Sequence, residues 1–96
     1  MKSVWFNPSS EQEMIHAASW YEAQEANLGM RFLTSIQEAV NRIECTPRLF
    51  PLLEGDVRRC LVRTFPFGVL FREKPETIEI VAVMHLHREP RYWDDR

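Results

Sequence analysis

The chain has 96 residues, of which 45% are hydrophobic and 27% are charged. These proportions are ordinary for a small globular domain and exclude a disordered, collagen-like or coiled-coil protein. The formal charge of −2 argues against tight non-specific binding to nucleic acid. No apolar run approaches the ~20 residues needed to cross a bilayer, and the N-terminus lacks the apolar region of a signal peptide. We therefore expect one domain over residues 1–96, in the cytoplasm and without a membrane partner.

The first half of the chain predicts a strand and two helices. Residues 2–6 favour a short strand because three bulky apolar residues lie together. A helix follows to about residue 26, and it begins either after Asn7-Pro8 or at Ser10, which with Glu13 fits a capping box. Residues 27–29 form a break, and apolar residues at spacings of 3 and 4 predict a second helix over residues 30–45. So short a connection predicts an antiparallel helical hairpin.

The second half predicts three strands, at residues 57–63, 67–72 and 78–87, after a loop over residues 47–55. A polar turn at residues 73–76 pairs the last two strands as a hairpin. Strict alternation would place Ile78, Ile80, Ala82, Met84 and Leu86 on one face of the last strand, with Val81, Val83, His85 and His87 on the other. The predicted fold is α+β and two-layered, with a helical hairpin on a mainly antiparallel sheet and the order β-α-α-β-β-β.

The two cysteines and two of the histidines each allow two interpretations of their role. Cys45 and Cys60 lie in different elements and have no metal-ligand spacing, so they are either buried or half-buried thiols or a redox pair. His85 and His87 are either a general acid or base or half-exposed residues at a strand end. Because no third ligand accompanies them, we expect neither a metal nor a cofactor.

Arginine is the strongest candidate for a binding function in the second half. Residues 1–55 carry a charge of −3 and residues 56–96 a charge of +1. The arginines of the predicted sheet and its end are Arg58, Arg59, Arg63, Arg72 and Arg88. They form either a patch for phosphate or an acidic partner, or a lattice of weak ion pairs with nearby carboxylates. The carboxylates in question are Asp56, Glu73, Glu79 and Glu89.

The C-terminal residues 88–96 are rich in aromatic and charged side chains. Tyr92 and Trp93 lie so close to the end that we expect the tail to dock on the body of the protein. Docking is either packing alone or the support of a site that stacks on a partner or a base.

The order of elements and several short segments resemble the RelE/ParE superfamily of type II toxin–antitoxin toxins, in particular its ParE-like branch. The resemblance covers essentially the whole chain. The segments that carry it are Trp20-Tyr21-Glu22, Leu28-Gly29-Met30-Arg31-Phe32, Pro47, Phe50-Pro51, Val57-Arg58-Arg59, Phe65-Pro66-Phe67, Ala82-Val83-Met84-His85, Arg88-Glu89-Pro90 and Tyr92-Trp93.

The resemblance implies a small toxin of the plasmid-stabilisation type, in a hetero-oligomer with an antitoxin that folds over it. It points to the groove between helices and sheet as the antitoxin's seat, with Trp20, Leu33, Ile36 and Val40 as candidate contacts.

Two activities occur in the superfamily, namely inhibition of DNA gyrase by binding and cleavage of mRNA on the ribosome. For gyrase, the resemblance suggests Arg88, Tyr92, Trp93 and Arg96 in an exposed tail. For a ribonuclease, the candidates are Arg58, Arg63, Arg72, His85, His87, Arg88 and Tyr92. We favour the gyrase inhibitor, which is not an enzyme, because a pI of 5.9 suits ribosomal RNA poorly. An inactive relative that binds only its antitoxin is a third alternative.

Overall fold

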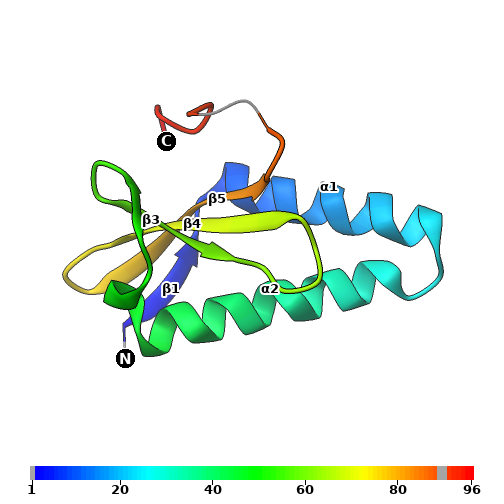
Figure 1. Ribbon diagram of the computed structural model, residues 1–96, viewed down its shortest axis with the longest axis horizontal. Helices are drawn as coiled ribbons and strands as arrows, with labels where there is room; N and C mark the ends of the chain where they lie inside the picture. The colour runs from blue at the N-terminus through cyan, green and yellow to red at the C-terminus, as the bar shows by residue number, and fades with distance from the viewer. Residues whose placement is uncertain (1, 89–90) are drawn as a thin grey trace.

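Two helices cover one face of a five-stranded sheet (Figure 1). The computed structural model describes residues 2–88 and 91–96, so Glu89 and Pro90 of the segment Arg88-Glu89-Pro90 lie outside the described residues. The elements are β1 (Ser3–Phe6), α1 (Pro8–Gln24), α2 (Leu28–Cys45), the 3-10 turn η1 (Pro47–Leu49), β2 (Leu52–Glu54), β3 (Val57–Leu61), β4 (Phe67–Glu73) and β5 (Thr77–His85). The predicted α+β class is confirmed.

The sheet order is β1-β5-β4-β3-β2, and only the β1–β5 pair is parallel. β1 pairs with β5 only from Thr77 to Ile80, because the chain then leaves the sheet at Asn7 to begin α1. The later half of β5 therefore has no neighbouring strand on this side among the described residues.

Helix α1 begins at Pro8, the earlier of the two predicted starts. The Asn7 side chain accepts a hydrogen bond from the Ser9 N–H (2.9 Å), and Pro8 occupies the first turn. Ser10 is not a cap. It is buried, and its hydroxyl donates to the Ile80 carbonyl of β5 at 2.9 Å, which ties the helix to the sheet.

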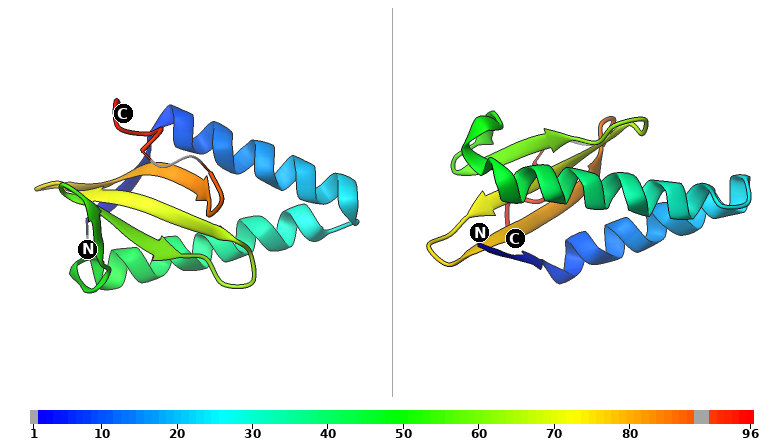
Figure 2. Two further views of the ribbon diagram at one scale, coloured as in Figure 1. Left: turned by 45° about the horizontal axis from the view of Figure 1, so that its top comes forward. Right: turned by 90° about the horizontal axis from the view of Figure 1, so that it is seen from below.

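Helix α2 begins at Leu28, two residues before the predicted start. Residues 25–27 connect the helices, and Asn27, the last of them, adopts a left-handed conformation (φ 72°) that turns the chain into α2. Gly29 lies where the two helices approach each other most closely, since a Cβ there would stand 2.5 Å from the Ala18 carbonyl oxygen. Both helices run side by side across one face of the sheet (Figure 2).

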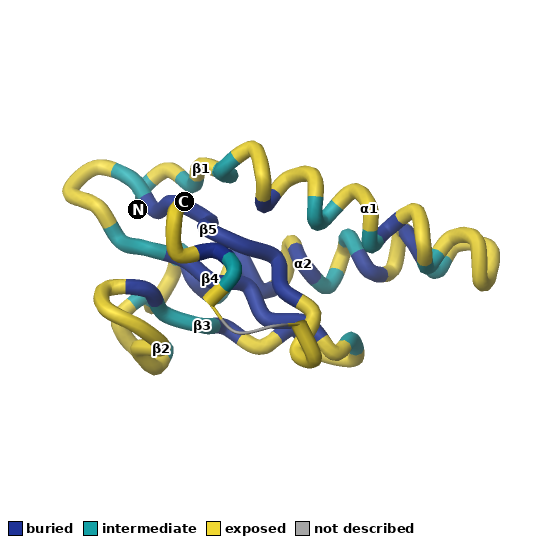
Figure 3. The backbone as a smooth tube through the Cα atoms, turned by 90° about the horizontal axis from the view of Figure 1, so that it is seen from above, coloured by how far each residue is buried: buried dark blue, intermediate teal, exposed yellow. Residues whose placement is uncertain are grey.

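The main core lies between the helices and the sheet. Its centre includes Phe32, Ile36 and Val40 of α2, all at most 4% exposed. Figure 3 shows β4 and β5 buried along most of their length, whereas the tip of the helical hairpin is exposed. The two helices thus bury the inner face of the sheet and leave their connecting end free.

A β-bulge changes the expected faces of β5. Leu70 pairs with Ala82, but the next residue, Phe71, pairs with Ile80, so Val81 is an extra residue in β5. Ile80 faces the main core, whereas Val81 and Ala82 both pack in a second cluster on the outer face. The prediction of one unbroken alternation from residue 78 to residue 86 is therefore wrong.

Two further boundaries differ from the prediction. The last strand ends at His85, and Leu86 and His87 form a turn, so the two histidines are not on one strand. Residues 52–54, predicted as loop, form the edge strand β2 against β3. All three residues of β2 are exposed, so the sequence carries no pattern of burial that would reveal the strand.

The C-terminal tail covers the outer face of the sheet, on the side away from α2 (Figure 1). Trp93 is 4% exposed and packs with five buried residues of the sheet, namely Val57, Leu70, Val81, Ala82 and Met84. The expectation that the tail docks is confirmed, and the expectation that Trp93 is exposed is wrong.

Candidate functional site

The predicted arginines lie on different faces of the sheet. Arg58 points to the helix side, where its Nη1 donates to the carbonyls of Phe50 (2.7 Å) and Arg48 (3.4 Å) and so secures the segment before β2. Arg72 points to the outer face and bonds to Asp56 and Glu79. Arg63 is exposed and pairs with Glu38 of α2 at 3.1 Å. The structure therefore does not bring these three guanidinium groups to one point.

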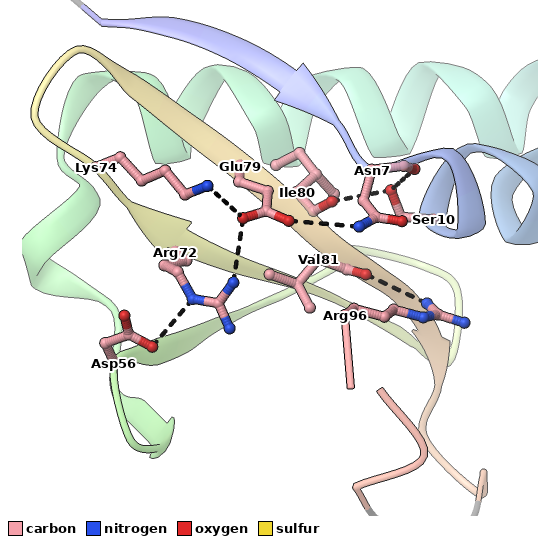
Figure 4. Close-up of polar contacts among 9 residues, drawn as sticks. All are labelled: Asn7, Ser10, Asp56, Arg72, Lys74, Glu79, Ile80, Val81 and Arg96. Carbon is pink, nitrogen blue, oxygen red and sulfur yellow. Dashed lines mark hydrogen bonds and ion pairs between the residues drawn. The ribbon is translucent and has the colours of Figure 1, made fainter. Parts of the chain in front are cut away.

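Glu79 organises the polar cluster on the outer face (Figure 4). Its side chain is 5% exposed, and its Oε1 lies 3.1 Å from both Arg72 Nη1 and Lys74 Nζ. The Asn7 side-chain amide donates to the other oxygen at 3.4 Å. Burial raises the pKa of Glu79, but hydrogen bonds from Lys74 and Asn7 and the charges of Lys74 and Arg72 outweigh it, so the pKa is lowered.

Arg72 is a structural cation in this cluster. Burial lowers the pKa of its guanidinium, but the Asp56 and Glu79 carboxylates outweigh that effect and the pKa is raised. Two carboxylates occupy N–H donors of this guanidinium and offset its charge, so it is poorly suited to bind an RNA phosphate. The ion-pair lattice predicted as one alternative is thus the arrangement found for Arg72.

A second site lies where α1 faces the free half of the β5 edge. Glu13 and His16 of α1, Phe67 of β4, Val83 and His85 of β5, and Arg88 and Tyr92 of the C-terminal segment line this pocket, which we call the α1–β5 pocket. Three predicted site residues meet here: His85, Arg88 and Tyr92. Glu13 and His16 were not predicted to contribute, although their spacing of three residues on one helix face was a usable signal.

The α1–β5 pocket combines a phenol, a guanidinium and an imidazole. Burial, together with the nearby Glu13 carboxylate, raises the pKa of Tyr92, so its hydroxyl stays protonated at neutral pH. The Arg88 guanidinium lies 4.1 Å above the Tyr92 ring centre. His85 packs edge-to-face on Phe67, with ring centres 5.1 Å apart, and its Nδ1 accepts the backbone N–H of His87 at 3.1 Å. His87 is exposed and does not line the pocket.

Side chains cover the part of the β5 edge that β1 leaves open. The Val83 N–H donates to Glu13 Oε1 (3.1 Å), and Arg96 Nη1 donates to the Val81 carbonyl (3.2 Å). Glu13 and Arg96 also pair with each other at 2.8 Å. A carboxylate and a guanidinium thus satisfy the backbone groups that a neighbouring strand would otherwise pair with. Arg96 is 17% exposed rather than free in an exposed tail, so that expectation is wrong.

Trp20 lies in a third, apolar site on the helix side. It is 61% exposed, and with Ala17, Tyr21, Pro66, Phe67 and His85 it lines what we call the Trp20 pocket. Of the other predicted antitoxin contacts, Leu33 is partly buried and lines a shallow pocket between the helices. Ile36 and Val40 are core residues at 1% and 4% exposure, so neither offers a surface to a partner in this conformation.

The cysteines are not paired. Cys60 is buried and burial raises the pKa of its thiol, whereas Cys45 is exposed, contrary to the expectation of two buried or half-buried thiols. Within residues 2–88 and 91–96, no group of three or more His, Cys, Asp or Glu side chains could hold a metal ion. No helix in that part of the chain is long and apolar enough to cross a membrane.

The structure is thus a small α+β protein with pockets on both sides of its sheet. A sequence model of the family described as "ParE toxin of type II toxin-antitoxin system, parDE" matches residues 4–90. The chain belongs to this family. The predicted resemblance is therefore confirmed, and membership implies an antitoxin partner.

A solved structure has the same fold. A chain of the structure titled "Chromosomal ParDE TA system from P. aeruginosa" superimposes with a TM-score of 0.66 at 17% sequence identity. The match covers 91% of this chain and 98% of that one. A search of curated proteins finds no significant match.

Proposed function

We propose that this chain is the toxin of a plasmid-stabilisation type module, that it acts in the cytoplasm by binding DNA gyrase, and that an antitoxin neutralises it. The observation that carries a binding role rather than ribonuclease chemistry is the dispersal of Arg58, Arg63 and Arg72, three of the arginines predicted for a ribonuclease site. Arg58 is held by carbonyls on the helix side, Arg63 by Glu38, and Arg72 by two carboxylates on the outer face. Stabilising the charge of RNA cleavage requires several cations at one point.

The Trp20 pocket is the proposed seat of the antitoxin. An exposed indole beside Tyr21 and Phe67 is an apolar patch of the kind that marks interaction sites. A segment that folds on binding gains most from such a preformed apolar groove. Trp20 and Leu33 remain the candidate contacts.

For gyrase, Arg88 and Tyr92 are the proposed contacts. Arg88 is exposed, and its side chain is held over the Tyr92 ring rather than paired with a carboxylate of the described residues. Trp93 and Arg96 have a supporting role, because they fix the tail on the sheet.

Pulse-labelling of bacteria after induction of the chain alone tests the proposal. If the chain inhibits gyrase, DNA synthesis stops before protein synthesis and the cells become filamentous. Arg88→Ala should restore growth, whereas the matched control Arg31→Ala, an exposed arginine paired with Glu25, should remain toxic. Early arrest of protein synthesis would contradict the gyrase target.

A ribonuclease remains the second candidate because the α1–β5 pocket gathers His85, Arg88 and Tyr92. A histidine can move a proton while an arginine stabilises phosphate charge. Cleavage of mRNA on purified ribosomes, abolished by His85→Ala but retained in His87→Ala, would establish this candidate instead. A chain that arrests neither synthesis, yet binds an antitoxin, would be the inactive relative.

A further inference from the structure

A separate pocket on the outer face of the sheet shares Arg88 and Trp93 with the contacts proposed above but has a different lining. It lies between β3, the end of β5 and the tail, and Arg59, Arg88, Arg91, Met84, Leu86 and Trp93 line it. We call it the Arg59 pocket. Met84 and Arg59 belong to the face opposite the main core, so this pocket and the Trp20 pocket lie on opposite sides of the sheet.

The Arg59 pocket holds two arginines, Arg59 and Arg88, whose guanidinium groups make no ion pair or hydrogen bond to another residue among those that the structure describes. Among the described residues, every other arginine either pairs with a carboxylate or, in the case of Arg58, donates to backbone carbonyls. Arg59 and Arg88 do neither within residues 2–88 and 91–96. The net charge of the chain is −2, so two such cations at one pocket make this site locally positive and suited to an anionic group.

Two buried donors at the pocket have no acceptor among the described residues. The Nε atom of Arg59 and the Nε1 atom of Trp93 are buried without a hydrogen-bond partner in the described part of the chain. Trp93 is 4% exposed, so water reaches its N–H poorly. A buried donor left without an acceptor is costly, and a ligand oxygen that satisfies it gains that free energy.

The Arg59 side chain packs against the backbone of β4 at Gly68. The neighbouring strand carries Gly68, and a Cβ there would come within 3.2 Å of Arg59 Cγ and Cδ. The absence of a side chain lets the Arg59 stem lie across β4, which directs the guanidinium to the pocket. Arg91 adds a third cation, although it already pairs with Asp94 at 2.9 Å.

The lining determines which ligand fits. Met84, Leu86 and Leu53 make the pocket largely apolar. Trp93 also lines it, but this ring is 4% exposed and so offers little face on which a base could stack. Glu54 also lines it and pairs with Arg91 at 3.9 Å, so it does not distinguish a phosphate from a carboxylate. A carboxylate beside a large apolar side chain satisfies both the arginines and this lining, and both occur together in an acidic peptide segment.

We propose that the Arg59 pocket binds an acidic segment of a partner protein, in which a Glu or Asp carboxylate accepts from Arg59 and Arg88 while an adjacent apolar side chain contacts Met84 and Leu86. This inference goes beyond the proposed function, because it assigns a second docking site away from the Trp20 pocket and holds for either target.

The test is an NMR titration of the full ¹⁵N-labelled chain, made by cell-free synthesis. The probe is the peptide acetyl-Leu-Glu-Leu-Glu-Leu-amide, and the matched control replaces both Glu residues with Gln. The readout is the indole N–H signal of Trp93, assigned by its loss in Trp93→Phe. We expect the Glu peptide to shift this signal, with the signals of Trp5 and Trp20 unchanged, and the Gln peptide to leave all three in place.

Arginine variants then test the site itself. Arg59→Gln should weaken peptide binding about tenfold or more, because a charge-assisted hydrogen bond is lost. Arg88→Gln serves the same purpose should Arg59→Gln fail to fold by circular dichroism, and Arg31→Gln, which removes the same charge elsewhere, should bind within about twofold of the unchanged chain. The proposal is overturned if neither peptide shifts the Trp93 signal, if both shift it equally, or if only a single-stranded RNA octamer does so.

Discussion

Replacing Trp93 with Ala tests whether the tail is part of the folded body. A buried tryptophan removes about 150–250 Å² from water, which at ~25 cal/mol per Å² corresponds to about 4–6 kcal/mol. Residual compactness of the unfolded chain lowers this value by roughly 10–40%. The substitution also removes a buried N–H without a partner among the described residues, which reduces its cost by about 1 kcal/mol. We therefore expect Trp93→Ala to lower the free energy of unfolding by about 3 kcal/mol.

Trp20→Ala is the matched control. It makes the same chemical change at a side chain that is 61% exposed and whose nearest ring is Tyr21, 5.2 Å away. Its expected cost is under about 1 kcal/mol. The cost of Trp93→Ala has a ceiling, since the variant can release the tail and keep the rest of the fold.

Urea unfolding followed by far-UV circular dichroism measures both free energies. Removal of residues 91–96 gives the ceiling, and Trp93→Ala should approach it without exceeding it. If Trp93→Ala and Trp20→Ala cost the same within about 0.5 kcal/mol, then the tail does not stabilise the sheet and the reasoning is refuted.

Three further predictions concern the helix contact, the buried carboxylate and the thiols. Gly29→Ala should destabilise the protein by about 1–3 kcal/mol in urea unfolding, because the new Cβ would lie 2.5 Å from a backbone oxygen. Gly55→Ala is the control, since φ is 55° there and nothing lies within 4 Å of the added Cβ. A smaller cost for Gly29→Ala than for Gly55→Ala would contradict the prediction. Glu79→Gln should cost about 3 kcal/mol at pH 7. Because the pKa of Glu79 is lowered in the folded state, its stabilisation is present above the ordinary value of 4.5 and disappears as the pH falls through the folded-state pKa. The difference in free energy of unfolding between the unchanged protein and Glu79→Gln should therefore shrink in acid, when unfolding is measured at both ends of this pH range. Cys45 should react with a thiol reagent in the native protein, whereas Cys60 should react only in urea. Cys45→Ser should therefore abolish the reaction of the native protein. A reaction that remains in this variant would show that Cys60 is accessible and would contradict the prediction.

Sequence patterns predicted those features of the fold that depend on residues close together in the chain. Apolar spacing in the second helix, the Asn7-Pro8 start of the first and the polar turn before β5 gave the order and type of the main elements. These signals are local because a helix cap or a turn depends on neighbours within a few residues. The exposed three-residue strand β2 has no such pattern, and it forms only because β3 lies beside it.

The candidate sites were predicted less well, for a reason seen in β5. One extra residue at Val81 changes which side chains face the helices, and no local pattern marks a bulge. Residue types were a fair guide, since His85, Arg88 and Tyr92 do line one pocket. Their partners Glu13 and His16 come from a helix about seventy residues earlier.

The sequence by itself therefore determined the fold class, the helical hairpin and the family, because these depend on composition and on short-range spacing. Only the tertiary structure decided which arginines are neutralised and which are free. Arg72 and Arg59 lie on adjacent strands and on the same face, yet Arg72 bonds to two carboxylates and Arg59 to none among the described residues. That difference arises from strand register and from where the tail docks, and both are set by packing between segments far apart in the chain.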